Sequence, residues 1–296
     1  MKMLTYVPTL DMNMLRNGDF GRFAAAFGEA LEGIGFVVLV NHGIPSDLLD
    51  SAYDVARQIF RYPDKVLTKY ETPENGRTTG FASFGVEHAK TSKKGDLKRF
   101  WHVRDEDAPG VVPNRWPSEV PVFRSTMLGL FEELYKLAQA LAPPLDSYLG
   151  LRPGTLGEML GRPETLLRIL HYPPIQGKPE GVRSHPHEDI NLYTLLVAAS
   201  ESGLQVKARD GRWVPVNEQP GSIVVNVGDM LQEFTNGRLR STTHRVVNSP
   251  RGTENERFSA PFFVHARSEA VLNSETRLTA GAYLTQRLRE IGLLSY

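Results

Sequence analysis

The chain of 296 residues contains no cysteine. Disulfide bonds, thiolate metal sites and cysteine nucleophiles are therefore excluded, and histidine and carboxylate side chains remain as the available metal ligands. Lys+Arg and Asp+Glu both number 34, so the formal net charge is zero. Because there is neither a basic excess nor a basic stripe, we expect no nucleic-acid or membrane-surface partner.

Long apolar segments are also absent from the sequence. No run approaches the roughly 18 apolar residues that a membrane-spanning helix needs. The N-terminal residues 1–4 lead into polar residues without the apolar core of a signal peptide. A hydrophobic content of 41% and a charged content of 23% are typical of a globular protein. We therefore expect a soluble, cytoplasmic protein.

The first half of the chain carries the helical patterns. Apolar positions repeat with a helical period in residues 20–34, 46–60 and 121–141. Ser46 is expected to cap the second helix. Pro143-Pro144 is expected to break the third, although the apolar pattern continues at Leu145, Tyr148 and Leu149. Between the first two lies a short apolar run, residues 36–40, which predicts a buried strand.

Residues 61–118 show no clear period, and long irregular segments inside a domain are usually functional or mobile. Their aromatic and imidazole side chains either line a substrate pocket or anchor the loops; the candidates are Phe81, Phe84, Phe100, Trp101 and His102. The lysine-rich run of residues 90–99 is expected to be a solvated loop.

Beyond residue 165 the pattern changes to short β-prone segments separated by turn residues. They are residues 166–172, 192–198, 203–208, 213–216, 222–227, 242–247 and 258–264. Asp210-Gly211 predicts a hairpin, and the repeated short strands indicate a sandwich or barrel. We expect one compact unit: residues 1–118 as a helix/strand region with pocket loops, 119–162 as helical support, 163–268 as the β-core and 269–296 as a C-terminal helix.

A cluster of imidazoles and carboxylates precedes the second of these segments. His185, His187 and Asp189 alternate, so on a strand they share one face. With His244 as a distant third ligand, His187 and Asp189 would form the two-histidine, one-carboxylate set of non-haem Fe(II) oxygenases. A zinc site of His185, His187 and His244, as in a metal-dependent hydrolase, competes with it. The spacing alone leaves both open.

Arg257 and Ser259 also alternate on a predicted strand. A guanidinium fork and a hydroxyl on one face suit a carboxylate, so the pair is a candidate anchor for a dicarboxylate co-substrate. The motif by itself is weak, because it arises by chance in many proteins. Its place one strand after a candidate metal ligand strengthens it.

Several motifs together resemble the 2-oxoglutarate/Fe(II)-dependent dioxygenases of the isopenicillin N synthase-like family. They are residues 35–44, Leu170-His171-Tyr172-Pro173-Pro174, His187-Glu188-Asp189, residues 221–229 with Thr235-Asn236-Gly237, His244-Arg245-Val246 and Arg257-Phe258-Ser259. The motifs occur in the family's order along nearly the whole chain, which makes the resemblance specific.

The resemblance implies a mainly β fold, a distorted double-stranded β-helix (jelly roll) with flanking helices. It implies that Fe(II) is bound by His187, Asp189 and His244, and that 2-oxoglutarate is held by Arg257, Ser259 and Tyr172. With O2, such an enzyme oxidises a small-molecule metabolite, by hydroxylation or else by desaturation or cyclisation, and releases succinate and CO2. Leu170 departs from the family, which commonly has asparagine there. The retained Asp189 disfavours halogenation.

Three alternatives remain from the sequence: an isopenicillin N synthase-like or aminocyclopropane carboxylate oxidase-like enzyme that does not use 2-oxoglutarate, a zinc hydrolase, and a non-catalytic binding module. Candidate substrate contacts are Arg168, Trp101, His102, Phe263 and His185. We expect structural roles for His42, His88, His265 and Glu188, and expect His171 to face away from Tyr172. The substrate and the oligomeric state stay open.

Overall fold

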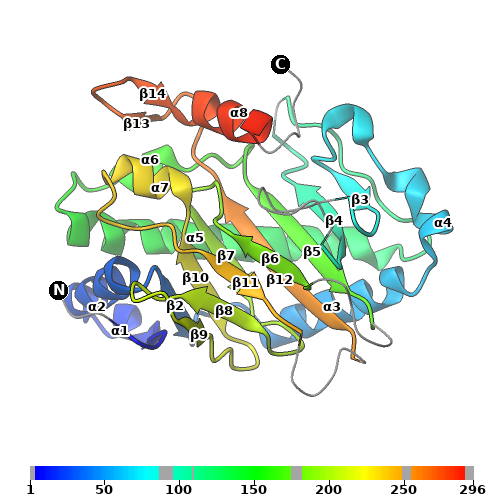
Figure 1. The fold of residues 1–296 in the computed structure, drawn as a ribbon, viewed down its shortest axis with the longest axis horizontal. Helices are drawn as coiled ribbons and strands as arrows, with labels where there is room; N and C mark the ends of the chain where they lie inside the picture. The colour runs from blue at the N-terminus through cyan, green and yellow to red at the C-terminus, as the bar shows by residue number, and fades with distance from the viewer. Residues whose placement is uncertain (1–3, 87–95, 109, 175–181, 249–254, 291–296) are drawn as a thin grey trace.

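The structure is a computed structural model that describes residues 4–86, 96–108, 110–174, 182–248 and 255–290. Two β-sheets face each other, and helices cover the outer face of the larger one (Figure 1). His88, most of the run 90–99 and the end of the expected C-terminal helix lie outside the described residues. The division into four sequence regions stays a prediction.

The larger sheet joins strands from both halves of the chain in the order β1-β2-β10-β7-β12-β5-β4-β3. Their bounds are β1 Thr9–Asp11, β2 Phe36–Val40, β3 Gly80–Ala82, β4 Arg99–Arg104, β5 Leu166–Tyr172, β7 Tyr193–Val197, β10 Ile223–Val227 and β12 Arg257–Val264. All pairings are antiparallel except β1 with β2.

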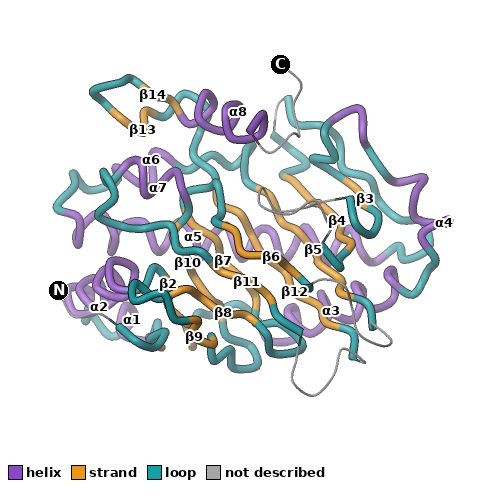
Figure 2. The backbone as a smooth tube through the Cα atoms, viewed as in Figure 1, coloured by secondary structure: helices purple, strands orange, loops and turns teal. Residues whose placement is uncertain are grey.

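The smaller sheet has the order β6-β11-β8-β9, with β6 Ser184–His187, β8 Leu204–Lys207, β9 Trp213–Pro215 and β11 His244–Val246. It lies in front of the larger sheet in the view of Figures 1 and 2. Apolar side chains pack between the sheets: Phe36, Val38 and Val224 from the larger, and Leu204, Val206 and Val246 from the smaller. The expected mainly β, double-stranded architecture is confirmed, as two facing sheets rather than a closed barrel.

The other face of the larger sheet packs on α2 (Phe20–Gly33), α3 (Ser46–Phe60) and α5 (Val122–Leu149). Alternation decides which side chains lie there, since neighbours on a strand point to opposite faces. In β12, for example, Phe258 and Phe262 face the helices, and Phe262 meets Phe131 of α5 edge-on at 4.9 Å. Ser259 and Phe263, each one residue further along, face the space between the sheets.

Two details of the helix predictions are wrong. The expected break at Pro143-Pro144 does not occur, and the helix α5 continues through them to Leu149, the last position of the apolar pattern. The carbonyls that lose their hydrogen bonds to these prolines belong to the exposed residues 139 and 140, where solvent can replace the partner. Ser46 is the first residue of α3 and makes no side-chain capping bond; Pro45 occupies the cap position.

The region 61–118 is more regular than expected, because it supplies β3 and β4 to the larger sheet. Both faces of β4 are covered, so its sequence shows no alternation of apolar and polar residues. Among the aromatic residues of this region, Phe84 is 43% exposed and is not part of the lining of the pocket between the two sheets.

The remaining elements are short. They are α1 Asn13–Arg16, α4 Asp64–Leu67, η1 Thr68–Tyr70, η2 Pro73–Asn75, α6 Thr155–Met159, α7 Asp229–Phe234, α8 Ala280–Glu290, β13 Val271–Asn273 and β14 Leu278–Thr279. The predicted hairpin at Asp210-Gly211 joins β8 to β9, with Gly211 at φ 86°. Within the described ranges, no helix is long and apolar enough to cross a membrane.

Candidate metal centre and co-substrate pocket

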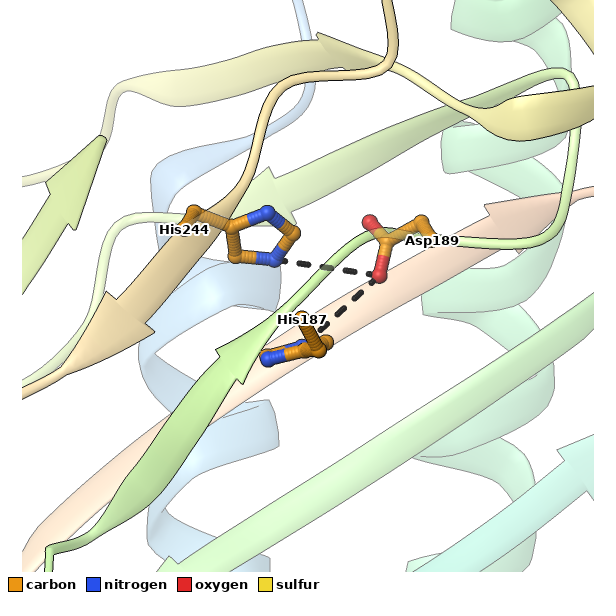
Figure 3. A group of neighbouring side chains, drawn as sticks. All are labelled: His187, Asp189 and His244. Atoms are coloured by element: carbon orange, nitrogen blue, oxygen red, sulfur yellow. Dashed lines mark ion pairs between the residues drawn. The ribbon is translucent and has the colours of Figure 1, made fainter. Parts of the chain in front are cut away.

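His187, Asp189 and His244 meet between the two sheets (Figure 3). His187 ends β6 and His244 begins β11, and the two residues are directly paired across these strands. Oδ1 of Asp189 lies 3.9 Å from Nε2 of His187 and 3.8 Å from Nε2 of His244. All three candidate ligand atoms lie within 4.8 Å of one another. Three atoms at this spacing can bind one metal ion after small side-chain adjustments.

Asp189 reaches this point from a loop, so the expectation that it shares a strand with His187 is wrong. Three hydrogen bonds hold it there instead. Its carbonyl accepts from the amide of Asp229 at 2.7 Å. Its Oδ2 accepts from Oγ1 of Thr194 at 2.6 Å and from Nδ2 of Asn226 at 2.9 Å. These bonds leave Oδ1 turned toward the imidazoles.

Thr194 and Asn226 are site residues that the sequence reasoning missed. A signal for Asn226 was present, because it is the polar residue within the otherwise apolar run of β10. An amide in such a run must find a partner, since an unpaired buried polar group is costly. Its partner is Asp189. Burial raises the pKa of Asp189, but the nearby His244 and His187 and these hydrogen bonds lower it by more, so the net shift is downward.

The hydrogen bonds of the two histidines fix their tautomers. Nδ1 of His187 lies 2.7 Å from the carbonyl oxygen of His185, and Nδ1 of His244 lies 3.1 Å from that of Thr242. A carbonyl oxygen only accepts, so each Nδ1 carries the proton and each Nε2 keeps its lone pair for a metal. Burial, with the nearby His244, lowers the pKa of His187 to about 4, which keeps this imidazole neutral at pH 7.

His185 does not join this group. Its Nδ1 lies 2.6 Å from Oδ1 of Asp96, whose Oδ2 forms an ion pair with Lys98 at 2.9 Å. The zinc alternative required His185 beside His187 and His244, and the described part of the chain does not form it. As a substrate contact His185 is also not supported, since it does not line the pocket. The run 90–99 is not all solvated: Asp96 and Lys98 are buried.

The three residues open into a pocket of about 550 Å³, which is open to solvent. Its walls come from both sheets and include Phe36, Lys98, Arg168, Leu170, Tyr172, Thr194, Leu196, Leu204, Asn226, Val246, Arg257, Ser259, Pro261 and Phe263. Phe36 and Lys98 were not expected here. Nothing in the local pattern of either residue showed which face of its segment would meet the pocket.

Arg257 and Ser259 point into the pocket together, as the spacing predicted. Nη1 of Arg257 donates to Oγ of Ser259 at 3.1 Å, and its Nε donates to the carbonyl of Glu201 at 2.9 Å. Its Nη2 is buried and has no hydrogen-bond partner within the described ranges; Oε1 of Glu218, 3.9 Å away, is likewise unpartnered there. Burial raises the pKa of Glu218 despite the charge of Arg257. A carboxylate ligand would satisfy this orphaned donor.

Tyr172 lies beside this guanidinium, with the centroid of its ring 5.2 Å from Cζ of Arg257. It is buried and lines the pocket. Leu170 lies two residues along the same face and lines the pocket with an apolar side chain. The hydrogen bond that asparagine makes in the family therefore has no donor at position 170.

The candidate substrate contacts separate into two groups. Arg168 and Phe263 line the pocket, and Cζ of Arg168 lies 5.3 Å from the ring centroid of Phe263. His102 does not line the pocket but lies behind Arg168, whose Nε donates to its Nε2 at 2.6 Å. Trp101 points to the helix side, where it packs 5.3 Å from Phe123 with no exposed surface. The prediction that Trp101 approaches the metal is therefore wrong. Neighbouring residues on a strand point to opposite faces, and Trp101 lies on the face of β4 opposite to His102.

The remaining described histidines have local partners. His171 faces away from Tyr172, as expected, and stacks on Phe258 at 4.7 Å. Nε2 of His42 donates to the carbonyl of Gly221 at 2.6 Å. Nδ1 of His265 donates to the carbonyl of Phe263 at 3.1 Å. None of these three belongs to the metal-binding group.

Two protein-family models match the chain. Residues 163–266 match the model of the 2OG-Fe(II) oxygenase superfamily, and residues 7–119 match the model described as non-haem dioxygenase in morphine synthesis N-terminal. The first range holds the three candidate metal ligands and Arg257. The second holds β1 to β4, the strands that extend the larger sheet at both edges.

Curated proteins and solved structures agree with these models. The chain is 34% identical to flavanone 3-dioxygenase 2 of Oryza sativa subsp. japonica, over 87% of this chain and 73% of the relative. It is 30% identical to protein DMR6-LIKE OXYGENASE 2 of Arabidopsis thaliana, over 92% of this chain and 76% of the relative.

A 2OG-Fe(II) oxygenase family protein of Caulobacter crescentus superposes with a TM-score of 0.86 at 35% identity, covering 96% of this chain and 99% of the other. A full-length Neurospora crassa protein, solved in complex with alpha-KG, gives a TM-score of 0.85 at 26% identity, covering 96% and 95% of the two chains. The chain belongs to the 2OG-Fe(II) oxygenase superfamily, and it is a 2-oxoglutarate-dependent dioxygenase that uses Fe(II) and 2-oxoglutarate to oxidise its substrate.

Proposed function

We propose that His187, Asp189 and His244 are the Fe(II) ligands, and that Arg257 and Ser259, beside Tyr172, hold the distal carboxylate of 2-oxoglutarate. One observation carries this assignment. Two imidazole Nε2 atoms and a carboxylate oxygen converge in a pocket that also contains a buried arginine N–H group with no partner in the described part of the chain. The first set suits Fe(II), and the second suits a carboxylate.

The chain's own groups divide the work. Bound iron supplies the activation of dioxygen, while 2-oxoglutarate is oxidised to succinate with release of CO2. The Nδ1–H bonds of His187 and His244 orient their Nε2 atoms, and the bonds from Thr194 and Asn226 orient Asp189. Part of the pocket wall is apolar, and it includes Phe36, Leu170, Leu196 and Val246.

We further propose that the reaction is hydroxylation of a small-molecule substrate, the default outcome of this chemistry. The Neurospora crassa protein has been solved with thymine, and JOX2 with 2OG, Fe and JA. Arg168 and Tyr172 lie on one face of β5, so strand geometry separates their Cα atoms by roughly 13 Å. We therefore place the substrate near Arg168 and Phe263, away from the co-substrate end. A cytoplasmic location stays a prediction.

The metal assignment is tested by adding Fe(II) and then 2-oxoglutarate to the purified chain under nitrogen. We expect one iron per chain and the visible absorption of an iron-bound 2-oxo acid. Asp189→Ala should lose both signals. His185→Ala is the matched control and should keep them, since His185 bonds to Asp96 instead. Loss of iron in His185→Ala with retention in Asp189→Ala would overturn the assignment.

A separate measurement tests the use of the co-substrate. Succinate should form in step with oxidised product once a substrate is supplied. Product without succinate would instead support an oxidase of the isopenicillin N synthase-like or aminocyclopropane carboxylate oxidase-like type, which activates dioxygen at the same iron.

A further inference from the structure

A second buried arginine lies next to the proposed co-substrate end of the pocket. Arg183 directly precedes β6 and is 1% exposed. Its Nη2 donates to the carbonyl of Asn255 at 2.6 Å, whereas its Nε and Nη1 are buried and have no hydrogen-bond partner among the residues that the structure describes. Unpaired buried donors of a charged group are costly. Such a group needs an explanation beyond packing.

Its position connects it to Tyr172. The ring centroid of Tyr172 lies 6.0 Å from Cζ of Arg183 and 5.2 Å from Cζ of Arg257. Both guanidinium groups therefore contact the same aromatic ring. The residue that follows Arg183 in the chain, Ser184, lines the pocket itself. Arg183 thus lies one layer behind the co-substrate end, and not on a distant surface.

Among the described residues, no carboxylate lies within close ion-pair distance of either guanidinium group. Arg183 and Arg257 are each 1% exposed. The ion pair that the structure shows for Arg257 is the long one to Glu218, at 3.9 Å. Arg183 has no ion pair with any described residue, and Glu201 acts on it only at longer range. Burying a cation is unfavourable unless an anion compensates its charge. The distal carboxylate of 2-oxoglutarate would bring that anion.

We propose that Arg183 is a positioning residue for the co-substrate: it holds the ring of Tyr172 against Arg257 and adds a second positive charge that favours the distal carboxylate of 2-oxoglutarate. The proposal rests on the proposed function, in which Arg257 and Ser259 hold that carboxylate. It assigns Arg183 to recognition of the carboxylate, and not to the iron or the substrate.

The test compares two ligands that differ only at that carboxylate. They are 2-oxoglutarate and 2-oxopentanoate, which has a methyl group in its place. Their dissociation constants are measured by equilibrium dialysis under nitrogen with Fe(II) present, for the wild type, Arg183→Met and Arg183→Lys. We expect Arg183→Met to weaken 2-oxoglutarate roughly tenfold, the scale for removing one nearby positive charge at the effective dielectric of a partly buried site. Binding of 2-oxopentanoate should change less than about twofold, and Arg183→Lys should recover most of the loss.

Two further variants make the result specific. Arg245→Met is the matched control, because Arg245 also stacks on an aromatic ring, Trp213 at 4.0 Å, but lies on the smaller sheet outside the pocket lining. It should change neither affinity. Arg257→Met is the benchmark and should lose the preference for 2-oxoglutarate.

Equal weakening of both ligands in Arg183→Met would show a purely structural role and overturn the proposal, as would an unchanged affinity for 2-oxoglutarate. If Arg257→Met loses the preference but Arg183→Met keeps it, only this proposal fails. If the wild type shows no preference for 2-oxoglutarate over 2-oxopentanoate, the proposed co-substrate site fails with it.

Discussion

Removing the hydroxyl of Thr194 should weaken iron binding without touching an iron ligand. Thr194 is 2% exposed, and its Oγ1 donates to Oδ2 of Asp189 at 2.6 Å. Valine has nearly the same shape, so Thr194→Val removes this bond and leaves the packing. Asn226 still holds Oδ2 at 2.9 Å. Asp189 would keep its place but lose half of the support that turns Oδ1 toward the imidazoles.

The size of the effect follows from the charge of the acceptor. A hydrogen bond to a charged group contributes roughly 1.5–3 kcal/mol, and each 1.4 kcal/mol is about tenfold in affinity. Thr194→Val should therefore weaken Fe(II) binding by roughly ten- to a hundredfold, the range expected when a partner of a metal ligand is removed. Thr194 also accepts from Nδ2 of Asn191 at 3.0 Å, so folding stability should fall by about 1 kcal/mol as well.

The assay is an anaerobic titration of Fe(II) against a competing chelator of known affinity. Thr165→Val is the control, because Thr165 is equally buried and donates to the carbonyl of Gly161 at 2.7 Å. That variant should lose comparable stability and keep the wild-type iron affinity. If Thr194→Val binds iron within twofold of the wild type, Asp189 does not depend on this bond and the reasoning is refuted.

Two predictions concern stability. Burial, with the charges of Arg99 and Arg183, lowers the pKa of His171 to about 3. Below about pH 6.5 this imidazole binds a proton in the unfolded chain but stays neutral in the folded chain. The free energy of unfolding is therefore unaffected by His171 above that pH and falls by roughly 1.4 kcal/mol per pH unit below it. Urea unfolding at pH 7 and pH 5 should show a smaller loss in His171→Phe, and an unchanged loss would contradict the assignment. Phe262→Ala should cost about 3–5 kcal/mol at pH 7, because Phe262 is fully buried against Phe131; a cost below about 1 kcal/mol would contradict the described packing.

The elements that could be predicted from the sequence are those marked by a local pattern of apolar and turn residues. The helices α2 and α3 and the strand β5 begin and end within one residue of the expected bounds, because periodicity and turn residues act over short distances. The order of the strands was not predictable in the same way, because pairing joins distant segments. β4 went unrecognised because both of its faces are covered.

The candidate site shows the same limit. His187, Asp189 and His244 were found from spacing and resemblance, and the structure brings them together. The support for Asp189 was not found, since Thr194 and Asn226 reach it only through the fold of two other strands. Lys98 was missed for a related reason: a lysine in a polar run gives no sign that its segment will be buried.

The most direct test of the central claim is anomalous diffraction at the iron absorption edge, from crystals grown under nitrogen with Fe(II) and 2-oxoglutarate. We predict a single iron peak within bonding distance of Nε2 of His187, Nε2 of His244 and Oδ1 of Asp189, with the distal carboxylate of 2-oxoglutarate on Arg257. A peak bound by His185, or an iron site without Asp189, would contradict the account.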